Sequence, residues 1–291
     1  MPVSPHHTSR FMAVAQRTAI RTWDDGFIHA GNLAYLSMLA IFPFFILAAA
    51  LFPFLGDSLD QTAMIDAVLG AMPPNVRAII EPVAQNTLQT SSGLLLWMGV
   101  AVGLWTISGL IESIRDVLRR AYDTKSSTSY WQSRLFSVGL ILIAVMLMIA
   151  SLFAQVAIGT AQQFVGEWSP QLVDTFSELQ LSRAVPAISL AGSLYLLFLT
   201  LTPGKYRARA YPKWPGVLAT SLWWLAVTSA LPPIITRAIT YDLIYGSLAG
   251  IMVVLFFFWL VGLGLVMGAE LNASLAQVPE DETNTNEEHA E

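Results

Sequence analysis

Apolar residues along this chain are grouped into six long runs that are separated by more polar segments. The runs cover residues 31–55, 93–111, 135–158, 185–202, 215–238 and 248–269. A helix needs about 20 apolar residues to cross a hydrocarbon layer of roughly 30 Å, and each run is about that long. The pattern therefore predicts an all-α polytopic membrane protein with six transmembrane helices.

The Lys and Arg residues are divided unevenly among the segments between these runs. The N-terminal segment, the second loop and the fourth loop together hold twelve of the fifteen. Positive residues near the ends of spans are retained in the cytoplasm, and an even number of spans places both termini on one side. We therefore expect cytoplasmic N and C termini.

Composition divides the chain into three parts. Residues 1–30 carry an apolar stripe from Phe11 to Phe27, which predicts an amphipathic helix in the cytoplasmic membrane interface. Residues 31–276 are the predicted transmembrane domain. Residues 277–291 are expected to be a disordered, acidic cytoplasmic tail, because six acids and no Lys or Arg fall after position 278.

Two of the predicted outer loops also contain apolar residues at helical spacing. Residues 57–92 have such a pattern on both sides of Pro73-Pro74, which predicts a helical hairpin. Residues 160–183 have a similar pattern around Pro170. The outer loops are therefore expected to be helical.

Composition agrees with a membrane protein and limits the kinds of catalytic or metal site that the chain is expected to contain. The chain is 55% hydrophobic and 12% charged, with a mean hydropathy of +0.58, whereas about 25% of residues in soluble domains are charged. Cysteine is absent, and the four histidines lie outside the apolar runs without helical ligand spacing. We therefore expect no metal centre, no cofactor and no enzymatic activity.

A polar stripe follows the second run into the basic loop behind it. The 3-4-3-4 spacing places five residues on one helix face: Trp105, Ser108, Glu112, Arg115 and Arg119. The stripe is either a solvated helix end or the inner mouth of a polar cleft, because charges at membrane depth normally face protein or water. Further candidates for this cleft are Glu270, Asn272, Asn32 and Tyr35, and Glu270 is expected to pair with Arg115 or Arg119.

Small residues and prolines mark positions for helix packing or hinges. Gly246 and Gly250, like Gly264 and Gly268, are four residues apart, a spacing that allows two helices to approach closely. Pro43 interrupts the hydrogen bonding of the first predicted span and is either a packing kink or a hinge.

Several motifs resemble those of the YihY/BrkB family. They are AGNLAY at 30–35 with IFP at 41–43, ESIRD at 112–116 with AY at 121–122, LTP at 201–203 with WPG at 214–216, YGSLAG at 245–250 and GAELNA at 268–273. Together they cover most of residues 10–276. Asn32 departs from the family, which often has a small residue there.

This resemblance implies a six-helix integral protein of the bacterial inner membrane. Members of the family have carried the label ribonuclease BN, one branch is linked to serum resistance, and some are connected with envelope lipid or lipopolysaccharide handling. The family implies location and fold more directly than activity.

Two functional hypotheses follow. The absence of charged residues between the interfaces argues against a strongly ion-coupled pump, whereas basic cytoplasmic loops suit anionic lipid headgroups. The first hypothesis is therefore translocation or export of a lipid or other amphiphile, although the same loops would also serve simply to fix topology. The alternative is a structural or assembly factor whose outer helices bind an envelope protein. Ribonuclease activity and nucleic-acid binding are not expected.

Overall fold

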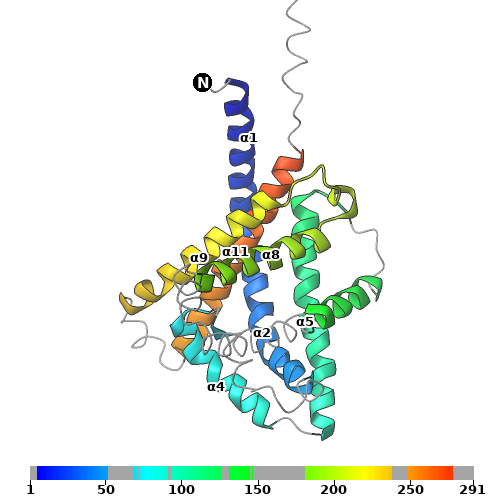
Figure 1. The fold of residues 1–291 in the computed structure, drawn as a ribbon, viewed down its shortest axis with the longest axis vertical. Helices are drawn as coiled ribbons and strands as arrows, with labels where there is room; N and C mark the ends of the chain where they lie inside the picture. The colour runs from blue at the N-terminus through cyan, green and yellow to red at the C-terminus, as the bar shows by residue number, and fades with distance from the viewer. Residues whose placement is uncertain are drawn as a thin grey trace, which may run out of the picture.

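The computed structural model describes residues 5–51, 69–70, 72–90, 93–125, 131–144, 146, 181–237 and 248–277. All regular elements within these ranges are helices (Figure 1). In chain order they are α1 (Pro5–Arg21), the π-helix η1 (Thr22–Gly26), α2 (Phe27–Leu51), α4 (Pro74–Thr90), α5 (Gly93–Ala121), the helix Trp131–Ala144, α8 (Leu181–Leu201), the 3₁₀ turn η3 (Gly204–Tyr206), α9 (Trp214–Arg237) and α11 (Ala249–Gln277).

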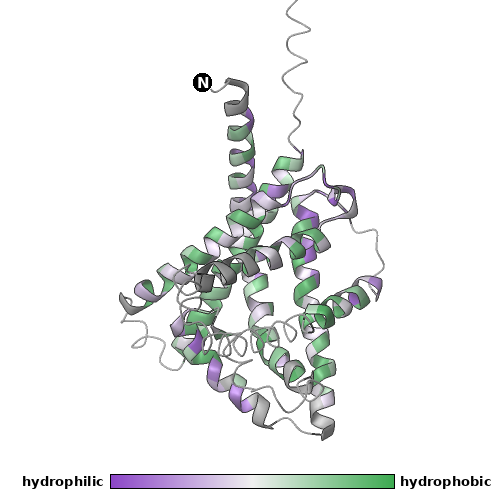
Figure 2. Ribbon diagram, viewed as in Figure 1, coloured by the Kyte–Doolittle hydropathy of each residue, from purple (hydrophilic) through white to green (hydrophobic). Residues whose placement is uncertain are grey.

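Four helices in the described part of the chain are long and apolar enough to cross a membrane. They are Arg10–Leu47, Trp97–Ala121, Trp214–Ile235 and Ala249–Gln277. These helices contain or overlap the first, second, fifth and sixth predicted spans, and Figure 2 shows apolar residues along much of their length. The all-α membrane architecture is therefore confirmed at this level.

The third and fourth predicted spans are represented by shorter apolar helices. These are Trp131–Ala144 and Leu190–Leu201. Much of the run 135–158 lies outside the described residues, as do the side chains at the start of the run 185–202. The total of six spans and the cytoplasmic position of both termini stay predictions.

Helix α11 lies at the centre of the bundle and packs extensively on α2 and α9. Glycines allow this close approach. A Cβ at Gly268 would lie 2.1 Å from Thr220 Oγ1 of α9, and a Cβ at Gly264 would lie 2.3 Å from the Trp223 ring. A side chain at either glycine would collide with α9, whereas Gly246 lies outside the described residues.

The contact between α2 and α5 uses a second pair of glycines. A Cβ at Gly103 would lie 2.9 Å from the side chain of Pro43, and one at Gly99 would lie 2.8 Å from Ile46. The helix α2 continues through Pro43 to Leu51. Pro43 therefore occupies a packed position between two helices. Gly250 is less crowded, since a Cβ there would make ordinary contact with Ile79 of α4 at 3.4 Å.

Helix α1 runs through η1 into α2, so the three form one continuous helical segment, and α1 does not fold back on α2 (Figure 1). The backbone is right-handed helical at both ends of η1, with φ −64° and ψ −38° at Arg21 and φ −65° and ψ −38° at Phe27. A π-helical segment inserts an extra residue into the helical register and often marks a functional site. The interfacial position predicted for residues 1–30 stays a prediction.

Helix α4 lies at the end of the bundle opposite α1 (Figure 1). Its apolar residues Val76, Ile80 and Ala84 are buried in a core cluster shared with α2, α9 and α11. The second half of the loop 57–92 is therefore helical, as expected. The first half, the predicted outer helix at 160–183 and the tail fall mostly or wholly outside the described residues.

Candidate functional site

Helix α5 carries a buried charge cluster where its apolar part ends. Glu112 and Arg115 form an ion pair of 2.5 Å one turn apart. Ser137, on the helix Trp131–Ala144, donates a hydrogen bond of 2.7 Å to Glu112, and Arg115 donates one of 3.4 Å to the Ser137 hydroxyl. Only 8% of Arg115 is exposed. Its charge is tolerated there because it is paired and hydrogen-bonded.

Two cation–π contacts add to this attachment of the helix Trp131–Ala144 to α5. The guanidinium of Arg115 lies 5.2 Å from the centre of the Phe136 ring. The guanidinium of Arg134 lies 4.3 Å from the centre of the Trp105 ring. Contacts of this kind contribute about 0.5–1 kcal/mol at exposed sites. The first contact joins two side chains that line the adjoining cavity, Arg115 and Phe136.

The cavity lies between α5, the start of the helix Trp131–Ala144 and the segment that follows α8. Its volume is about 520 Å³, which is within the range of roughly 300–1,000 Å³ found for small-molecule sites. The basic residues that line it are Arg115, Arg119, Lys125, Lys205 and Arg207. None of the described lining residues is Asp or Glu. We call this feature the basic cavity.

The segment after α8 is held in place by its own cations. Arg207 donates hydrogen bonds of 2.7 Å and 3.2 Å to the backbone carbonyls of Thr200 and Thr202, which lie at the C-terminal end of α8 and need such donors. Lys213 in turn donates to the carbonyls of Arg207 and Ala208 at 3.1 and 2.9 Å. Burial, followed by the charge of Arg207, lowers the pKa of Lys213. The segment that carries Arg207 is therefore held against the end of α8 on its side of the cavity.

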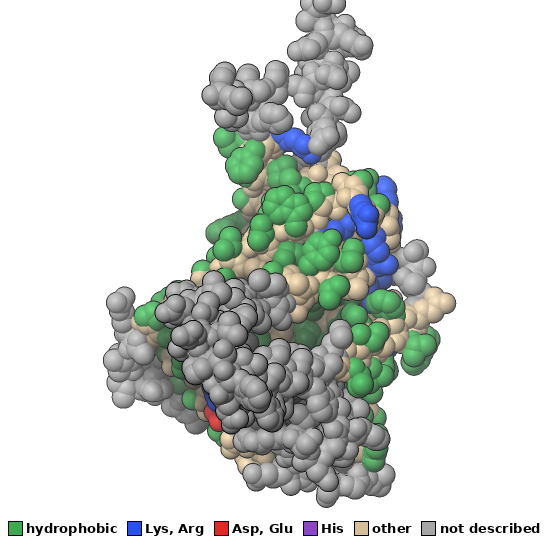
Figure 3. Space-filling model, viewed as in Figure 1, with side chains coloured by type: hydrophobic (Ala, Val, Ile, Leu, Met, Phe, Trp, Pro, Cys, Tyr) green, Lys and Arg blue, Asp and Glu red, His purple; other side chains and the backbone are tan. Residues whose placement is uncertain are grey.

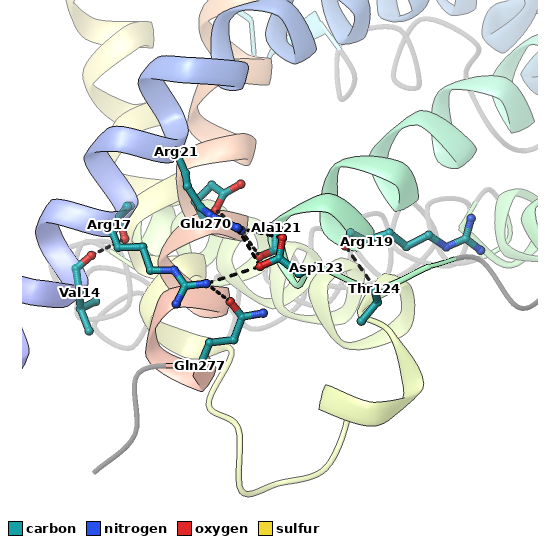
Figure 4. Close-up of polar contacts among 10 residues, drawn as sticks. Val14, Arg17, Arg21, Arg119, Ala121, Asp123, Thr124, Glu270 and Gln277 are labelled. Carbon is teal, nitrogen blue, oxygen red and sulfur yellow. Dashed lines mark hydrogen bonds and ion pairs between the residues drawn. The ribbon is translucent and has the colours of Figure 1, made fainter. Parts of the chain in front are cut away.

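A separate ion-pair cluster joins α1 to the C-terminal ends of α5 and α11 (Figure 4). Arg21 contacts both carboxylate oxygens of Asp123 at 2.7 and 2.8 Å and donates to the Ala121 carbonyl at 3.0 Å. Arg17 lies 3.5 Å from Asp123 and donates to Gln277. Asp123 has a φ of 50°, a left-handed conformation that Asp tolerates better than most residues.

Glu270 belongs to this cluster and not to the polar stripe of α5. Its carboxylate lies 3.9 Å from Arg21 Nη1, whereas Arg115 pairs with Glu112 and Arg119 pairs with Asp116 at 3.2 Å. The predicted pairing of Glu270 with Arg115 is therefore wrong. The reason is that α1 packs on α11 and places Arg21 beside Glu270, a contact that helical periodicity alone does not reveal.

The nine predicted cleft residues lie at separate places in the structure. Arg115 and Arg119 line the basic cavity, with Glu112 paired to Arg115. Ser108, Asn32 and Asn272 make hydrogen bonds elsewhere, to the Trp105 carbonyl, to Ser113 and to the start of α9 respectively. Glu270 belongs to the ion-pair cluster. Tyr35 and Trp105 are exposed.

Three of the five basic residues that line the cavity were not among the predicted site residues. Lys125, Lys205 and Arg207 entered the sequence argument only as members of the basic loops, which were used to predict orientation and attraction of anionic headgroups. The sequence feature that could have pointed to these three residues is that the second and fourth loops, which contain them, were expected on the same membrane face. Their convergence on one cavity depends on the packing of helices that are far apart in the sequence.

The described helices, together with their exposed apolar side chains, define a helical membrane protein. Residues 21–291 match the family described as virulence factor BrkB, and the chain belongs to this family. The resemblance to the YihY/BrkB family is thereby confirmed.

Curated relatives agree with this assignment. The chain is 26% identical to the ribonuclease-like protein YfkH of Bacillus subtilis, over 87% of this chain and 91% of that protein. It is 25% identical to a UPF0761 membrane protein of Rhodospirillum rubrum, over 86% of this chain and 55% of that longer protein. A UPF0761 membrane protein of Alteromonas mediterranea is 24% identical, over 92% of this chain and 87% of its own length. No solved structure matches the chain.

Proposed function

We propose that this protein moves an anionic lipid or another anionic amphiphile across the bacterial inner membrane, without strong coupling to an ion gradient. The observation that carries this proposal is the basic cavity, in which five cations from two distant segments line one space. Anionic headgroups are attracted to basic residues at a membrane surface by about 1 kcal/mol per Lys or Arg.

The surroundings of the cavity suit a molecule with both a charged and an apolar part. Phe136 lines the cavity and is 49% exposed. Trp131 and Leu135 on the same helix are exposed as well. A headgroup in the cavity would therefore leave its acyl chains beside an apolar helix surface. Figure 3 shows Lys and Arg side chains gathered near the end of the molecule that carries α1.

The sequence supports transport without ion coupling. The six apolar runs contain no Asp, Glu, His or Lys, and Arg237 lies at the end of its run. Ion-coupled carriers usually place ionisable groups within the membrane to bind and release the coupling ion. Movement of the amphiphile would then follow its own concentration difference between the leaflets.

The proposal is tested in vesicles that contain the purified full-length chain and fluorescent phosphatidylglycerol. We expect faster exchange of the labelled lipid between leaflets than in protein-free vesicles, and slower exchange for Lys205→Gln. The matched control is Arg209→Gln, because Arg209 is an exposed cation of the same loop that does not line the cavity. Equal exchange rates with and without protein, for this lipid and for fluorescent cardiolipin, would reject the proposal.

A role in envelope assembly is the second candidate, and α4 is the observation that favours it. This helix is docked on the bundle through Val76 and Ile80 and leaves Gln85 and Asn86 exposed. It would therefore present a fixed polar surface to an envelope protein. Crosslinking from position 85 should then trap one dominant partner, whereas scattered adducts would count against this candidate.

We propose no nuclease activity, although YfkH is named as ribonuclease-like. Metal-dependent cleavage of a phosphodiester needs clustered His or carboxylate ligands, and the described residues contain no group of three that could hold a metal ion. We expect purified protein to leave tRNA intact. Cleavage that disappears in a point variant would overturn this expectation.

A further inference from the structure

The charges of the basic cavity do not balance. Of its five cations, Arg115 is paired with Glu112 at 2.5 Å and Arg119 with Asp116 at 3.2 Å. The other three, Lys125, Lys205 and Arg207, have no carboxylate partner among the described residues. The cavity therefore carries a formal excess of about three positive charges, which a ligand is able to neutralise.

The two arginines that are held by backbone or buried partners form a fixed part of the cavity wall. Arg115 is held by Glu112 and Ser137, and Arg207 by the carbonyls at the end of α8. Groups that are ordered before a ligand arrives lose little conformational entropy when it binds. The cavity thus has a preorganised wall of positive charge.

The two lysines complete the cavity from different parts of the chain. Lys125 follows the C-terminal end of α5, and Lys205 lies in η3 after α8. A lysine is a compact charge on a flexible stem and adapts to phosphate groups at different positions. With about 520 Å³ between them, these cations surround a space large enough for an organic headgroup.

We propose that the basic cavity selects amphiphiles whose headgroup carries at least two negative charges on phosphate. This inference rests on the proposed function and names its substrate class. A singly charged phosphodiester would leave most of the excess positive charge unbalanced, whereas a phosphate monoester, a diphosphate or a pair of phosphodiesters would neutralise it more fully.

Binding is measured by native mass spectrometry of the full-length protein in detergent, with three probes. Phosphatidylglycerol carries one negative charge, cardiolipin carries two on one lipid, and inorganic pyrophosphate supplies the phosphate chemistry without an acyl chain. We expect cardiolipin to bind at least about 5-fold more tightly than phosphatidylglycerol, as one additional lysine contact at the membrane surface would give. We expect pyrophosphate to bind more weakly than cardiolipin.

The variant that tests the cavity is Lys125→Gln combined with Lys205→Gln. It should lose about 30-fold in cardiolipin affinity, the loss expected for two surface charges. Arg209→Gln removes a neighbouring cation outside the cavity and should change the affinity less than about 2-fold. Equal binding of the two lipids, or equal losses in the double variant and the control, would overturn the proposal. Tight binding of pyrophosphate without cardiolipin binding would overturn its lipid part.

The leaflet-exchange assay separates this inference from the proposed function. Selective cardiolipin binding without lipid exchange would support the headgroup selectivity and reject translocation. Exchange that is equally fast for phosphatidylglycerol and cardiolipin, and that is slowed to the same extent for both lipids by the two lysine substitutions, would support the proposed function and reject the selectivity.

Discussion

Gly268 lies where α9 and α11 come closest, and its position has no room for a side chain. A Cβ there would lie 2.1 Å from Thr220 Oγ1 and 2.7 Å from the Gly216 carbonyl. We expect Gly268→Ala to destabilise the protein by about 1–3 kcal/mol through overpacking, and thermal unfolding in detergent measures this. The matched control is Gly192→Ala, since a Cβ at Gly192 has nothing within 4 Å. Similar melting temperatures for the two variants would contradict the close packing.

Asn272 bridges the same two helices with its side-chain amide. Its oxygen accepts a hydrogen bond of 2.8 Å from the Gly216 amide, and its nitrogen donates one of 3.0 Å to the Lys213 carbonyl. Asn272→Ala leaves two buried backbone groups without their partner, which should cost about 1–3 kcal/mol for each group left unsatisfied. Asn32→Ala is the control, because its 2.8 Å bond to Ser113 is exposed. A smaller loss at position 272 than at position 32, in chemical unfolding, would disprove the bridge.

At the residue scale, spacing predicts which surface of a helix is used but not what it contacts. The four-residue interval between Gly264 and Gly268 indicated close packing. It did not reveal that the partner surface includes Gly216, where a Cβ would lie 2.2 Å from the Gly268 carbonyl. The partner of Glu270 was missed for the same reason, because tertiary structure selects among several equally plausible cations.

At the element scale, α1 is attached to the bundle partly through exposed charges. Arg21 and Asp123 are in contact at 2.7 Å, and the Asp123 side chain is 54% exposed. Such a pair contributes about 0.2–1 kcal/mol and is screened by salt. We expect Arg21→Gln and Asp123→Asn each to speed hydrogen exchange in α1, and the double variant to exceed either one only slightly.

The control for this attachment is Asp116→Asn, which removes a carboxylate that pairs within α5. It should leave the exchange of α1 amides unchanged. High salt should reduce the difference between the wild-type protein and the Arg21 and Asp123 variants. Effects of the two substitutions that simply add would show that the residues act independently.

The helices were predicted more accurately than their ends. The apolar run 93–111 identifies α5, but the helix continues to Ala121, and ion pairs between residues three apart support this polar part. Similarly, the boundary predicted near residue 30 falls within α2, which continues from α1 and η1. Hydropathy locates the part of a helix that favours lipid, whereas hydrogen bonding and packing decide where the helix ends.

At the scale of the whole molecule, the sequence predicted a membrane bundle but not the basic cavity. The count of Lys and Arg in the second and fourth loops indicated that they share a membrane face. The cavity itself requires α5, the helix Trp131–Ala144 and the end of α8 to be brought together. This arrangement depends on non-local contacts such as Arg115 with Ser137, which no periodic pattern encodes.

The same distribution of charge predicts the orientation of the whole molecule in the membrane, and this prediction is open to a direct test. The chain has no cysteine, so single-cysteine variants report only the position where each is introduced. Gln85→Cys lies on α4, and Arg209→Cys lies in the basic loop before α9, both at exposed positions. Because positive loops are retained in the cytoplasm, an impermeant maleimide added to spheroplasts should label position 85 readily and position 209 only after permeabilisation. The reverse labelling would place the basic cavity at the outer leaflet and remove its access to cytoplasmic lipid headgroups.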